Sequence, residues 1–395
     1  MKIAIIGGKL QGVEAAYLAA KAGWEATVID RNPDAPAKGL CNEFIQVEIS
    51  STEQLTSLLE PFDLILPALE NVAVLRMLHP YARQASHPIL FDFDAYALTT
   101  SKVACNQLFR DMQLPLPESY PDSGFPVIVK PNHTSGSQGV RSIADAKQLR
   151  SYLTASTGDH VIQGFVGGPS YSLEVIGIPG NYQPLQTTEL EMDQDYDCKR
   201  VLAPSDLPGN LVTVLEKMSV AVAEKIALRG LMDIEVIHDG NTLRILEIDA
   251  RLPSQTPICV YTSTATNMLG LLAGVFLEGH SPLSPLPDEG RGVICEHIQI
   301  TPGELTVAGE HIMSSAGPLQ LKTDFFGADE AITNQAADRS NWVATLIISA
   351  PNRKAAWEKR QTIITNIRSA FSIEHYSDPY PTLDPVPIKP DVIKK

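Results

Sequence analysis

Four acidic residues near the middle of the chain have the spacing of a metal site. Asp233 and Glu235 lie two positions apart in one apolar segment, and Glu247 and Asp249 lie two apart in the next. Since successive side chains of a strand point to opposite faces, the two acids of each segment share a face. Like charges gathered on one face repel each other unless a cation lies between them. Oxygen ligands favour Mg²⁺, which typically takes few protein carboxylates together with substrate phosphates.

The two acidic segments are predicted to be the strands of a hairpin. Met232–His238 and Leu243–Asp249 flank Asp239-Gly240-Asn241, a typical turn sequence. We expect a three-residue loop to set Glu235 directly opposite Glu247, with their Cβ atoms about 5 Å apart. The simpler alternative is a solvated hairpin whose acids face water.

An arginine and a polar loop follow the second strand directly. Arg251 is placed to meet a carboxylate or a developing oxyanion. The loop continues through Leu252-Pro253-Ser254-Gln255-Thr256-Pro257, in which two prolines stiffen a polar segment. Such a loop beside the acids favours a binding site over the solvated hairpin.

Two lysines precede these segments. Lys102 opens a predicted helix, and Lys130 ends the apolar strand Pro126–Lys130. The loop that follows, Asn132–Gly139, is small and polar enough to fold its N–H groups over a phosphate. The alternative for each lysine is a solvated edge residue, and for the loop a plain turn.

A glycine-rich turn lies near the N-terminus. Gly7-Gly8-Lys9-Leu10-Gln11-Gly12 connects a predicted strand to a predicted helix, and Asp30 closes the next strand. Its GGxxxG spacing differs from the GxGxxG of dinucleotide sites. Lys9 and Leu10 also place side chains where a bound pyrophosphate must come close to the backbone. We therefore favour a tight turn over NAD binding. A small carboxylate bound at the start of the helix remains an alternative.

The first hundred residues alternate strand and helix signals, which predicts a parallel sheet wrapped by helices. The first helix carries apolar residues at Val13, Ala16, Tyr17 and Ala20. The predicted strands are Lys2–Ile6, Ala26–Ile29, Phe44–Ile49, Asp63–Leu66 and Pro88–Phe91.

The pattern changes near Asp92, beyond which helices and longer strands are mixed. Ser101 is a predicted N-cap. The predicted helices are Ser101–Met112, Ala144–Leu153, Val212–Leu228 and Asn267–Leu277, and His160–Gln163 is a further strand. Pro379–Lys395 holds five prolines in 17 residues, which predicts an extended tail.

Composition excludes several functional classes. The chain has 395 residues, with 31 Lys plus Arg against 46 Asp plus Glu, a net charge of −15. This acidity argues against binding to nucleic acid or to anionic membranes, and no apolar run reaches the ~18 residues of a membrane helix. The five cysteines form no CxxC pair and the N-terminus has no signal-peptide pattern. We therefore expect a cytoplasmic protein without a disulfide framework.

Taken together, these motifs resemble the ATP-grasp superfamily, in which two lysines, a small-residue loop and paired acids follow one another. The glycine turn resembles the pre-ATP-grasp domain of its carboxylate–amine ligases. Three stretches closely resemble the pyrrolysine-biosynthesis ligases (the PylC family): Gly7–Gly12 with Glu14–Tyr17, Asp195–Cys198, and Glu247–Pro257. Members of that family join 3-methyl-D-ornithine to the ε-amino group of L-lysine through an acyl phosphate made from ATP.

The resemblance covers residues 1–350 and implies an ATP-grasp fold of the α/β (α+β) class. The implied organisation is a Rossmann-like pre-ATP-grasp domain at 1–97, a lid subdomain at 98–166, a domain with the metal and substrate site at 167–378, and the proline-rich tail at 379–395.

The resemblance also implies roles for individual residues. Arg251, Glu247 and Lys130 would be catalytic, and Glu235, Glu247 and Asp249 would hold Mg²⁺. The residues that would bind ATP are Lys102, Lys130, Ser135, Ser137, Gln138, Gly139, Gln163, Phe165 and Val166. Those that would bind the amino-acid substrates are Lys9, Leu10, Gln11, Glu70, Glu174, Asp197, Asp233, Arg251, Ser254, Gln255 and Thr256. Asp197, Glu174 and Asp233 are equal candidates for the acid that deprotonates the lysine amine.

The sequence departs from the superfamily pattern at the nucleotide hinge. Gln163 stands where relatives often carry Glu, and Ser170 stands where many carry an acid, so we expect backbone contacts to the nucleotide. A homodimer is the default expectation for such ligases. Two alternatives stay open: another ATP-grasp ligase or carboxylase with a different substrate, and a nucleotide-binding protein without catalysis.

Overall fold

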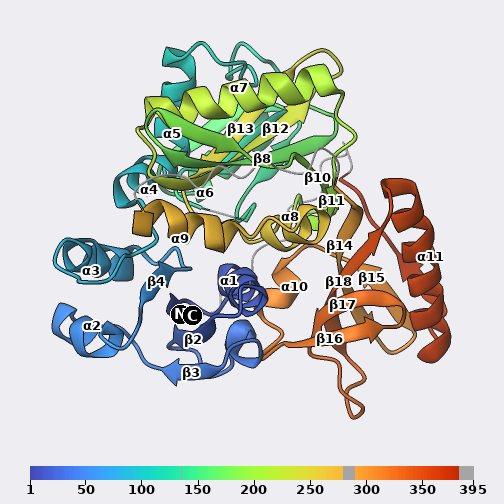
Figure 1. Cartoon of the computed structure of the whole chain (residues 1–395). Helices are drawn as coiled ribbons and strands as arrows, with labels where there is room; N and C mark the ends of the chain where they lie inside the picture. The colour runs from blue at the N-terminus through green and yellow to red at the C-terminus, as the bar shows by residue number, and fades with distance from the viewer. Residues whose placement is uncertain (135, 279–289, 382–395) are drawn as a thin grey trace.

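The computed structural model describes residues 1–134, 136–278 and 290–381. Its strands form three sheets of four, twelve and three strands. Figure 1 shows the N-terminal part in blue beneath the green strands of the largest sheet, with the C-terminal part in orange beside both. The chain is therefore a mixed α/β fold, as the sequence predicts.

The N-terminal sheet is parallel, with strand order β3-β2-β1-β4. Its strands are β1 (Lys2–Ile6), β2 (Glu25–Asp30), β3 (Glu43–Gln46) and β4 (Leu64–Pro67). They are joined or flanked by α1 (Leu10–Lys21), the 3₁₀ helix η1 (Pro36–Gly39), α2 (Thr52–Leu59), α3 (Val72–Ala82) and α4 (Phe93–Thr99).

The predicted fifth strand of this sheet is wrong. Pro88–Phe91 makes one isolated parallel bridge, between Ile65 and Ile89, and then enters α4. Proline has no N–H to donate, and Asp92 caps α4 by accepting from Ala95 N at 3.0 Å. The segment is therefore too short to add a strand. Similarly, β3 ends at Gln46 and not at the predicted Ile49.

The glycine turn before α1 is a close-packed turn. Gly7 has φ +111°, and a Cβ there would lie 2.3 Å from the carbonyl oxygen of Ala68. A Cβ on Gly12 would lie 2.2 Å from the carbonyl oxygen of Gly7. Asp30 Oδ2 accepts from Gly8 N at 2.6 Å and so holds the turn. The interpretation of the glycines as a tight turn is thus confirmed.

The largest sheet runs in the order β13-β12-β8-β10-β11-β14-β18-β17-β16, with β9 beside β8, β15 beside β14 and β19 beside β15. The bounds of its strands are β8 (Ser170–Ile178), β9 (Asn181–Pro184), β10 (Thr188–Met192), β11 (Cys198–Ala203), β12 (Gly230–His238), β13 (Leu243–Asp249), β14 (Gly292–Thr301), β15 (Glu304–Val307), β16 (Gln320–Phe325), β17 (Ala328–Thr333), β18 (Trp342–Ala350) and β19 (His375–Ser377).

Helices cover both faces of the β13-β12-β8 part of this sheet. One face packs against α5 (Lys102–Asp111) and α7 (Gly209–Lys225), with Ile234 and Val236 in that core. The other packs against α9 (Met268–Glu278), while α8 (Pro257–Thr264) packs on β11, β14 and β18. Elsewhere α11 (Arg353–Ala370) covers β14 and β18, and the short α10 (His311–Ser314) precedes β16.

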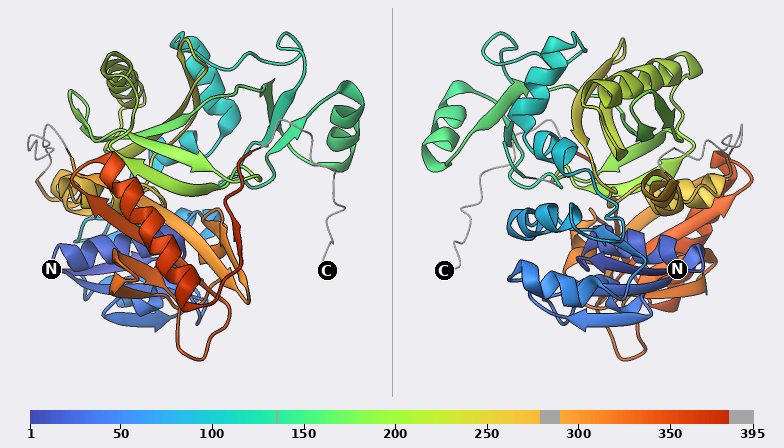
Figure 2. Two further views of the ribbon diagram at one scale, coloured as in Figure 1. Left: turned by 90° about the vertical axis from the view of Figure 1, so that its right-hand side faces the viewer. Right: turned by 60° about the vertical axis from the view of Figure 1, so that its left-hand side comes forward.

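The three-stranded sheet has the order β6-β5-β7 and is antiparallel. It consists of β5 (Val127–Pro131), β6 (Arg141–Ile143) and β7 (His160–Gly164), with α6 (Ala146–Ala155) between the last two. Figure 2 shows it projecting from the rest of the molecule. The three sheets thus fall within the segments 1–97, 98–166 and 167–378, while the boundaries themselves remain a prediction.

The parts of the chain are held together by a shared core. Residues of β1 and α1 pack in one hydrophobic cluster with residues of α8, α9 and β11. As a result α1 is buried from Gln11 to Ala19, on almost every side and not only on the predicted stripe.

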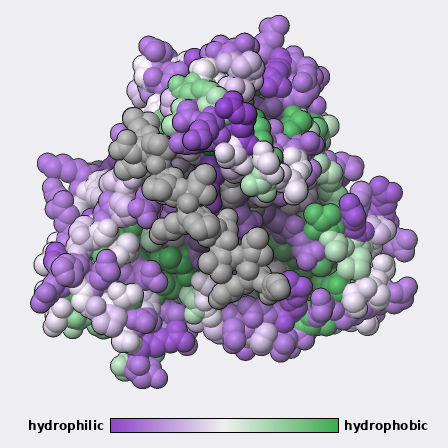
Figure 3. All heavy atoms as spheres, turned by 180° about the vertical axis from the view of Figure 1, so that it is seen from behind, coloured by the Kyte–Doolittle hydropathy of each residue, from purple (hydrophilic) through white to green (hydrophobic). Residues whose placement is uncertain are grey.

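In the described residues no single helix is long and apolar enough to cross a membrane, and α8 and α9 reach that length and composition only as a pair bent by 98°. Figure 3 shows a largely hydrophilic rear surface with small apolar patches.

Candidate functional site

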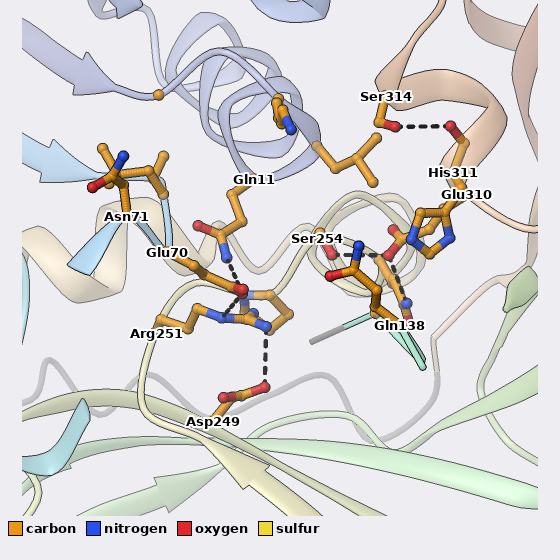
Figure 4. Close-up of a pocket in the computed structure, with 18 of the residues that line it drawn as sticks. Gln11, Glu70, Asn71, Gln138, Asp249, Arg251, Ser254, Glu310, His311 and Ser314 are labelled. Carbon is orange, nitrogen blue, oxygen red and sulfur yellow. Dashed lines mark hydrogen bonds and ion pairs between the residues drawn. The ribbon is translucent and has the colours of Figure 1, made fainter. Parts of the chain in front are cut away.

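A cavity of about 700 Å³ lies where the N-terminal sheet, the acidic hairpin and α10 meet. Figure 4 shows its centre, with Gln11, Glu70 and Arg251 facing Ser254, Glu310 and His311. The predicted site residues that line it are Lys9, Leu10, Gln11, Glu70, Ser137, Gln138, Asp197, Asp233, Glu235, Glu247, Asp249, Arg251, Ser254, Gln255 and Thr256. Residues from distant parts of the sequence are thus brought together at one place.

The hairpin places its acids in direct register. Glu235 pairs with Glu247, and Asp233 pairs with Asp249, across β12 and β13. The predicted pairing is confirmed, but the predicted three-residue loop is wrong. His238 pairs with Leu243, so the loop has four residues, and a bulge next to Glu235 supplies the further shift of one residue.

The acids are buried and crowded. Burial, and then the charges of Glu247 and Asp249, raise the pKa of Glu235 to about 8. Burial raises the pKa of Asp249 to about 6, against the influence of Arg251. Burial also raises the pKa of Asp233, whose Oδ1 has no hydrogen-bond partner among the described residues. This face therefore holds more carboxyl groups than can all ionise together.

Two lysines provide part of the counter-charge. Lys102 Nζ lies 3.1 Å from Glu247 Oε2 and donates to the carbonyl oxygen of Thr134 at 2.6 Å. Burial alone would raise the pKa of Glu247, but Lys102 and Lys130 hold it below its usual value. Burial in turn lowers the pKa of Lys130. Both lysines flank the acids without lining the cavity.

The small-residue loop is docked over one side of the cavity. Ser137 donates through Oγ to the carbonyl oxygen of Tyr196 at 2.6 Å, and Ser137 and Gln138 line the cavity. Gly136 and Gly139 have φ of +55° and +78°, conformations that favour glycine. Gly139 lies outside the cavity lining, and the predicted ATP contact Ser135 lies outside the described residues.

Arg251 joins the hairpin to the N-terminal domain. Its Nε lies 2.9 Å from Glu70 Oε1, and its Nη2 donates to Asp249 Oδ2 at 3.0 Å. Gln11 Nε2 donates to the same Glu70 oxygen at 3.2 Å. Burial disfavours the charge of the guanidinium, but Asp249 and Glu70 outweigh it and raise the pKa of Arg251. Arg251 is thus a fixed cation between two domains.

The polar loop after Arg251 contacts two buried glutamates. Ser254 Oγ and Gln255 Nε2 donate to Glu310 Oε1 at 3.3 and 3.0 Å. Thr256 donates to Glu174, and burial raises the pKa of Glu174 to about 7. Glu174 lies behind this loop and does not line the cavity.

Glu310 and His311 are cavity residues that the sequence reasoning missed. Glu310 is 3% exposed, its Oε2 has no hydrogen-bond partner among the described residues, and burial raises its pKa to about 7. His311 Nδ1 lies 2.6 Å from Asp197 Oδ2. No local pattern marks the pair, because they lie at the start of a four-residue helix about 60 residues after the hairpin.

The predicted nucleotide hinge lies apart from the cavity lining. Gln163 is buried and donates through Nε2 to Asn106 Oδ1 at 2.8 Å. The N–H of Phe165 donates to the carbonyl oxygen of Pro126 at 2.9 Å. Neither they nor Val166 line the cavity. The roles of all three remain predictions.

The acids fit a divalent cation that other ligands complete. Among the described residues no group of three or more His, Cys, Asp or Glu side chains could hold a metal ion alone. Mg²⁺ is typically bound through one or two carboxylates and substrate phosphates. The pKa of Glu235 is raised because Lys130 and Lys102 do not offset its burial and the charges of Glu247 and Asp249. A bound Mg²⁺ would supply the missing positive charge.

Comparisons with known proteins identify the family of the chain. Residues 99–255 match the family described as the ATP-grasp domain. The 3-methyl-D-ornithine–L-lysine ligase of Methanosarcina barkeri (strain Fusaro) is 36% identical over 314 residues, 79% of this chain and 84% of that protein. The ligase of the same name from Methanosarcina mazei is 34% identical over 373 residues, covering 93% and 96% of the two chains.

Solved structures share the fold at low sequence identity. The biotin carboxylase domain of Hydrogenobacter thermophilus 2-oxoglutarate carboxylase, solved with MgADP and bicarbonate, has a TM-score of 0.72 at 14% identity, covering 92% of this chain and 89% of that one. An N5-carboxyaminoimidazole ribonucleotide synthetase in complex with ADP has a TM-score of 0.66 at 15% identity, covering 94% and 97%. Given the identity and coverage of its Methanosarcina relatives, the chain belongs to the family of 3-methyl-D-ornithine–L-lysine ligases within the ATP-grasp enzymes.

Proposed function

We propose that the chain is an ATP- and Mg²⁺-dependent ligase of pyrrolysine biosynthesis. It joins the carboxylate of (3R)-3-methyl-D-ornithine to the ε-amino group of L-lysine through an acyl phosphate. The observation that carries the proposal is the fixed position of Arg251, which lines the cavity together with the acidic hairpin face and the loop residues 136–138.

In the first step, the substrate carboxylate attacks the γ-phosphate of ATP, and ADP leaves. Lys102, Lys130 and the N–H groups of the loop bind the phosphates and offset their charge. Glu235, Glu247 and Asp249 would hold Mg²⁺, which when bound neutralises phosphate charge. Lys102 must exchange part of its contact with Glu247 for a phosphate, and its 3.1 Å ion pair places it ready to do so.

In the second step, the lysine amine attacks the acyl phosphate and phosphate leaves. Arg251 donates to the carbonyl oxygen as negative charge develops on it. Its contacts with Asp249 and Glu70 fix the guanidinium before the reaction, so little reorganisation is needed.

The cavity suits substrates with ammonium groups. Asp197, Asp233 and Glu310 line it, and each has a carboxylate oxygen without a hydrogen-bond partner among the described residues. A buried carboxylate oxygen without a hydrogen-bond partner favours a cationic ligand, because the cation lowers the free energy of burying the negative charge. All seven predicted contacts of the two ends line the same cavity. We infer that Ser254, Gln255 and Thr256 bind the diamino acid and that Lys9, Leu10, Gln11 and Glu70 bind L-lysine.

Mass spectrometry of the product tests the proposal directly. The protein is incubated with ATP, Mg²⁺, 3-methyl-D-ornithine and L-lysine, and the expected product is their isopeptide together with one ADP per bond. Parallel reactions replace the amine or the acid with D-alanine or bicarbonate. Ligation of those substitutes in place of the expected pair would point to another ATP-grasp reaction.

Two further parts of the proposal concern organisation. We infer domain boundaries at 97, which falls within α4, and at 166, which falls in the loop between β7 and β8. Limited proteolysis should cut near 166, because an exposed loop is cleaved more readily than a helix. We also infer a homodimer, since one structural relative is described as a dimer. Light scattering that gives the mass of one chain would contradict the dimer.

A further inference from the structure

A histidine–aspartate pair faces the cavity from α10. His311 Nδ1 lies 2.6 Å from Asp197 Oδ2, and the same oxygen accepts from the backbone N–H of His311 at 3.0 Å. Because the carboxylate binds the Nδ1 proton, the neutral imidazole presents an unprotonated Nε2. His311 lines the cavity and its side chain is 53% exposed, so a substrate can reach the ring.

The pair is rigidly held. Asp193 Oδ1 accepts from the N–H groups of Asp195 and Asp197, and its Oδ2 accepts from Gly309 N at 2.9 Å. Gly309 packs so closely on Asp197 that a Cβ there would lie 2.0 Å from Oδ2. Asp197 is therefore fixed by the chain on both sides.

The imidazole also lies next to the loop that covers the phosphates in the proposed function. A Cβ on Gly136 would lie 3.4 Å from both Cε1 and Nε2 of His311. Ser137 of the same loop binds the carbonyl oxygen of Tyr196, next to Asp197. In the proposed function the ring would therefore lie on the side of the cavity where the loop covers the phosphates.

The acids that the sequence left as candidates are less well placed. Glu174 lies outside the cavity lining and is bonded to Thr256. Asp233 pairs with Asp249 inside the crowded hairpin face. Asp197 reaches the cavity, but one oxygen is committed to His311.

We propose that His311, oriented by Asp197, is the group that accepts the proton from the ammonium of the attacking amine. This proposal rests on the proposed function. The ammonium N–H bond breaks and its proton moves to Nε2, and the freed electron pair forms the C–N bond. The C–O bond to phosphate then breaks, the second amine proton leaves with phosphate, and His311 releases its proton to solvent.

The charges around His311 suit a base at neutral pH. Asp197 and Asp193 face it from the β10–β11 turn and Glu310 from its own helix, and together they raise its pKa above the usual 6.5. The loop residues Gly136, Ser137 and Gln138 next to it carry no charge. A lysine amine, with a free pKa of about 10.4, needs such an acceptor at neutral pH.

Hydroxylamine separates proton transfer from carboxylate activation. It is uncharged at neutral pH, so it traps an acyl phosphate as a hydroxamate without a base. His311→Asn should form hydroxamate from 3-methyl-D-ornithine and ATP at the wild-type rate, while ligation of L-lysine falls by roughly 10²-fold at pH 7. The loss should shrink as pH rises toward 10, where the amine deprotonates unaided.

Further variants test whether His311 acts as a proton acceptor or only supports the structure. Asp197→Asn keeps an oxygen that accepts from the backbone N–H of His311, but it removes the negative charge that raises the pKa of His311. The acidic limb of the plot of kcat against pH should therefore move to lower pH. His375→Asn, on the exposed strand β19, is the matched control and should change neither rate.

Three outcomes would overturn the inference. If His311→Asn ligated L-lysine at the wild-type rate, His311 could not be the proton acceptor, while the proposed function of the protein would still hold. Equal loss of hydroxamate and ligation would place His311 in the activation step. A wild-type protein that forms no hydroxamate would remove the proposed function, and the inference with it.

Discussion

Glu235 and Glu247 lie directly opposite each other on β12 and β13, although counting back from the hairpin loop would pair Glu235 with Leu246. The bulge at this point shifts the register by one residue, which reverses the face of every later side chain on β13. Ile245 before the bulge and Ile248 after it therefore share one core. Without the bulge, Glu247 would point into that core and not into the cavity.

The crowded carboxylates should make the ligand-free protein less stable as pH rises. The folded pKa of Glu235, about 8, exceeds its ordinary 4.5, and those of Glu174 and Glu310 are raised to about 7. Stability from these protonated groups is fully present below about pH 4.5 and is lost as pH rises through 7 to 8. We expect Tm to fall by several degrees between pH 6.5 and 8, a window above the titration of the buried His297, whose pKa burial lowers to about 4.

Thermal scans with and without Mg²⁺ and ATP check this slope. Glu235→Gln should flatten it, because the amide cannot ionise. Mg²⁺ with ATP should flatten it in the wild type as well, since a cation favours the ionised acids. A slope identical in the wild type and the variant would show that Glu235 does not titrate in this range.

Local elements could be predicted from the sequence because their signals are local. β1 is predicted to the residue, and Ser101 caps α5 by accepting from Ala104 N at 3.2 Å. The bulge in β13 leaves no such signal, so the sequence predicts the pairing of Glu235 with Glu247 correctly but the length of the hairpin loop wrongly. Period-two alternation alone cannot show where a strand changes face.

The candidate site was predictable where it follows motifs and not where it depends on packing. Arg251 and the hairpin acids come from one short stretch of sequence, and the structure places them together. Glu310 and His311 reach the cavity only because β14 and β15 return the chain to it. Conversely, Glu174 lies in a strand beside the acids, but Thr256 stands between it and the cavity. The sequence does not show how far a side chain lies from the cavity.

Arg251→Lys should reduce ligation while leaving the fold intact. Lysine presents one ammonium, which cannot contact both Glu70 and Asp249 and still donate to a carbonyl oxygen. We expect kcat to fall roughly 10²- to 10³-fold, the usual loss of one oxyanion donor. Arg244→Lys, at the hairpin loop, is the matched control. A change of less than twofold in Arg251→Lys would remove Arg251 from the reaction.

Glu296→Gln should destabilise the C-terminal part of the sheet without affecting the reaction. Glu296 is fully buried on β14 and accepts from Arg200 Nε at 2.6 Å and from Arg360 Nη2 at 2.7 Å. Removing its charge weakens the ion pairing of two buried guanidinium groups, which keep Asp378 and, for Arg200, Glu191 as counter-ions. We therefore expect a loss of about 1–3 kcal/mol. Urea unfolding measures this loss, and ligation at 20 °C should stay within twofold.

The matched control for Glu296→Gln is an exposed ion pair. Lys2 Nζ and Glu25 Oε1 lie 4.0 Å apart, and both side chains are 57% exposed. Glu25→Gln should change the free energy of unfolding by less than ~1 kcal/mol. If both variants lost equally little stability, the buried cluster would contribute no more than a surface pair.

Gly309→Ala should impair ligation only by displacing the side chain of Asp197. The new Cβ would lie 2.0 Å from Asp197 Oδ2, so the carboxylate must move, and it takes the support of His311 Nδ1 with it. We expect lysine ligation to fall at least 10-fold while hydroxamate formation is kept, with a loss of stability of about 1–3 kcal/mol. Gly209→Ala is the control, because nothing lies within 4 Å of a Cβ there and alanine favours its helix. Unchanged ligation in Gly309→Ala would mean that the position of Asp197 does not govern amine attack.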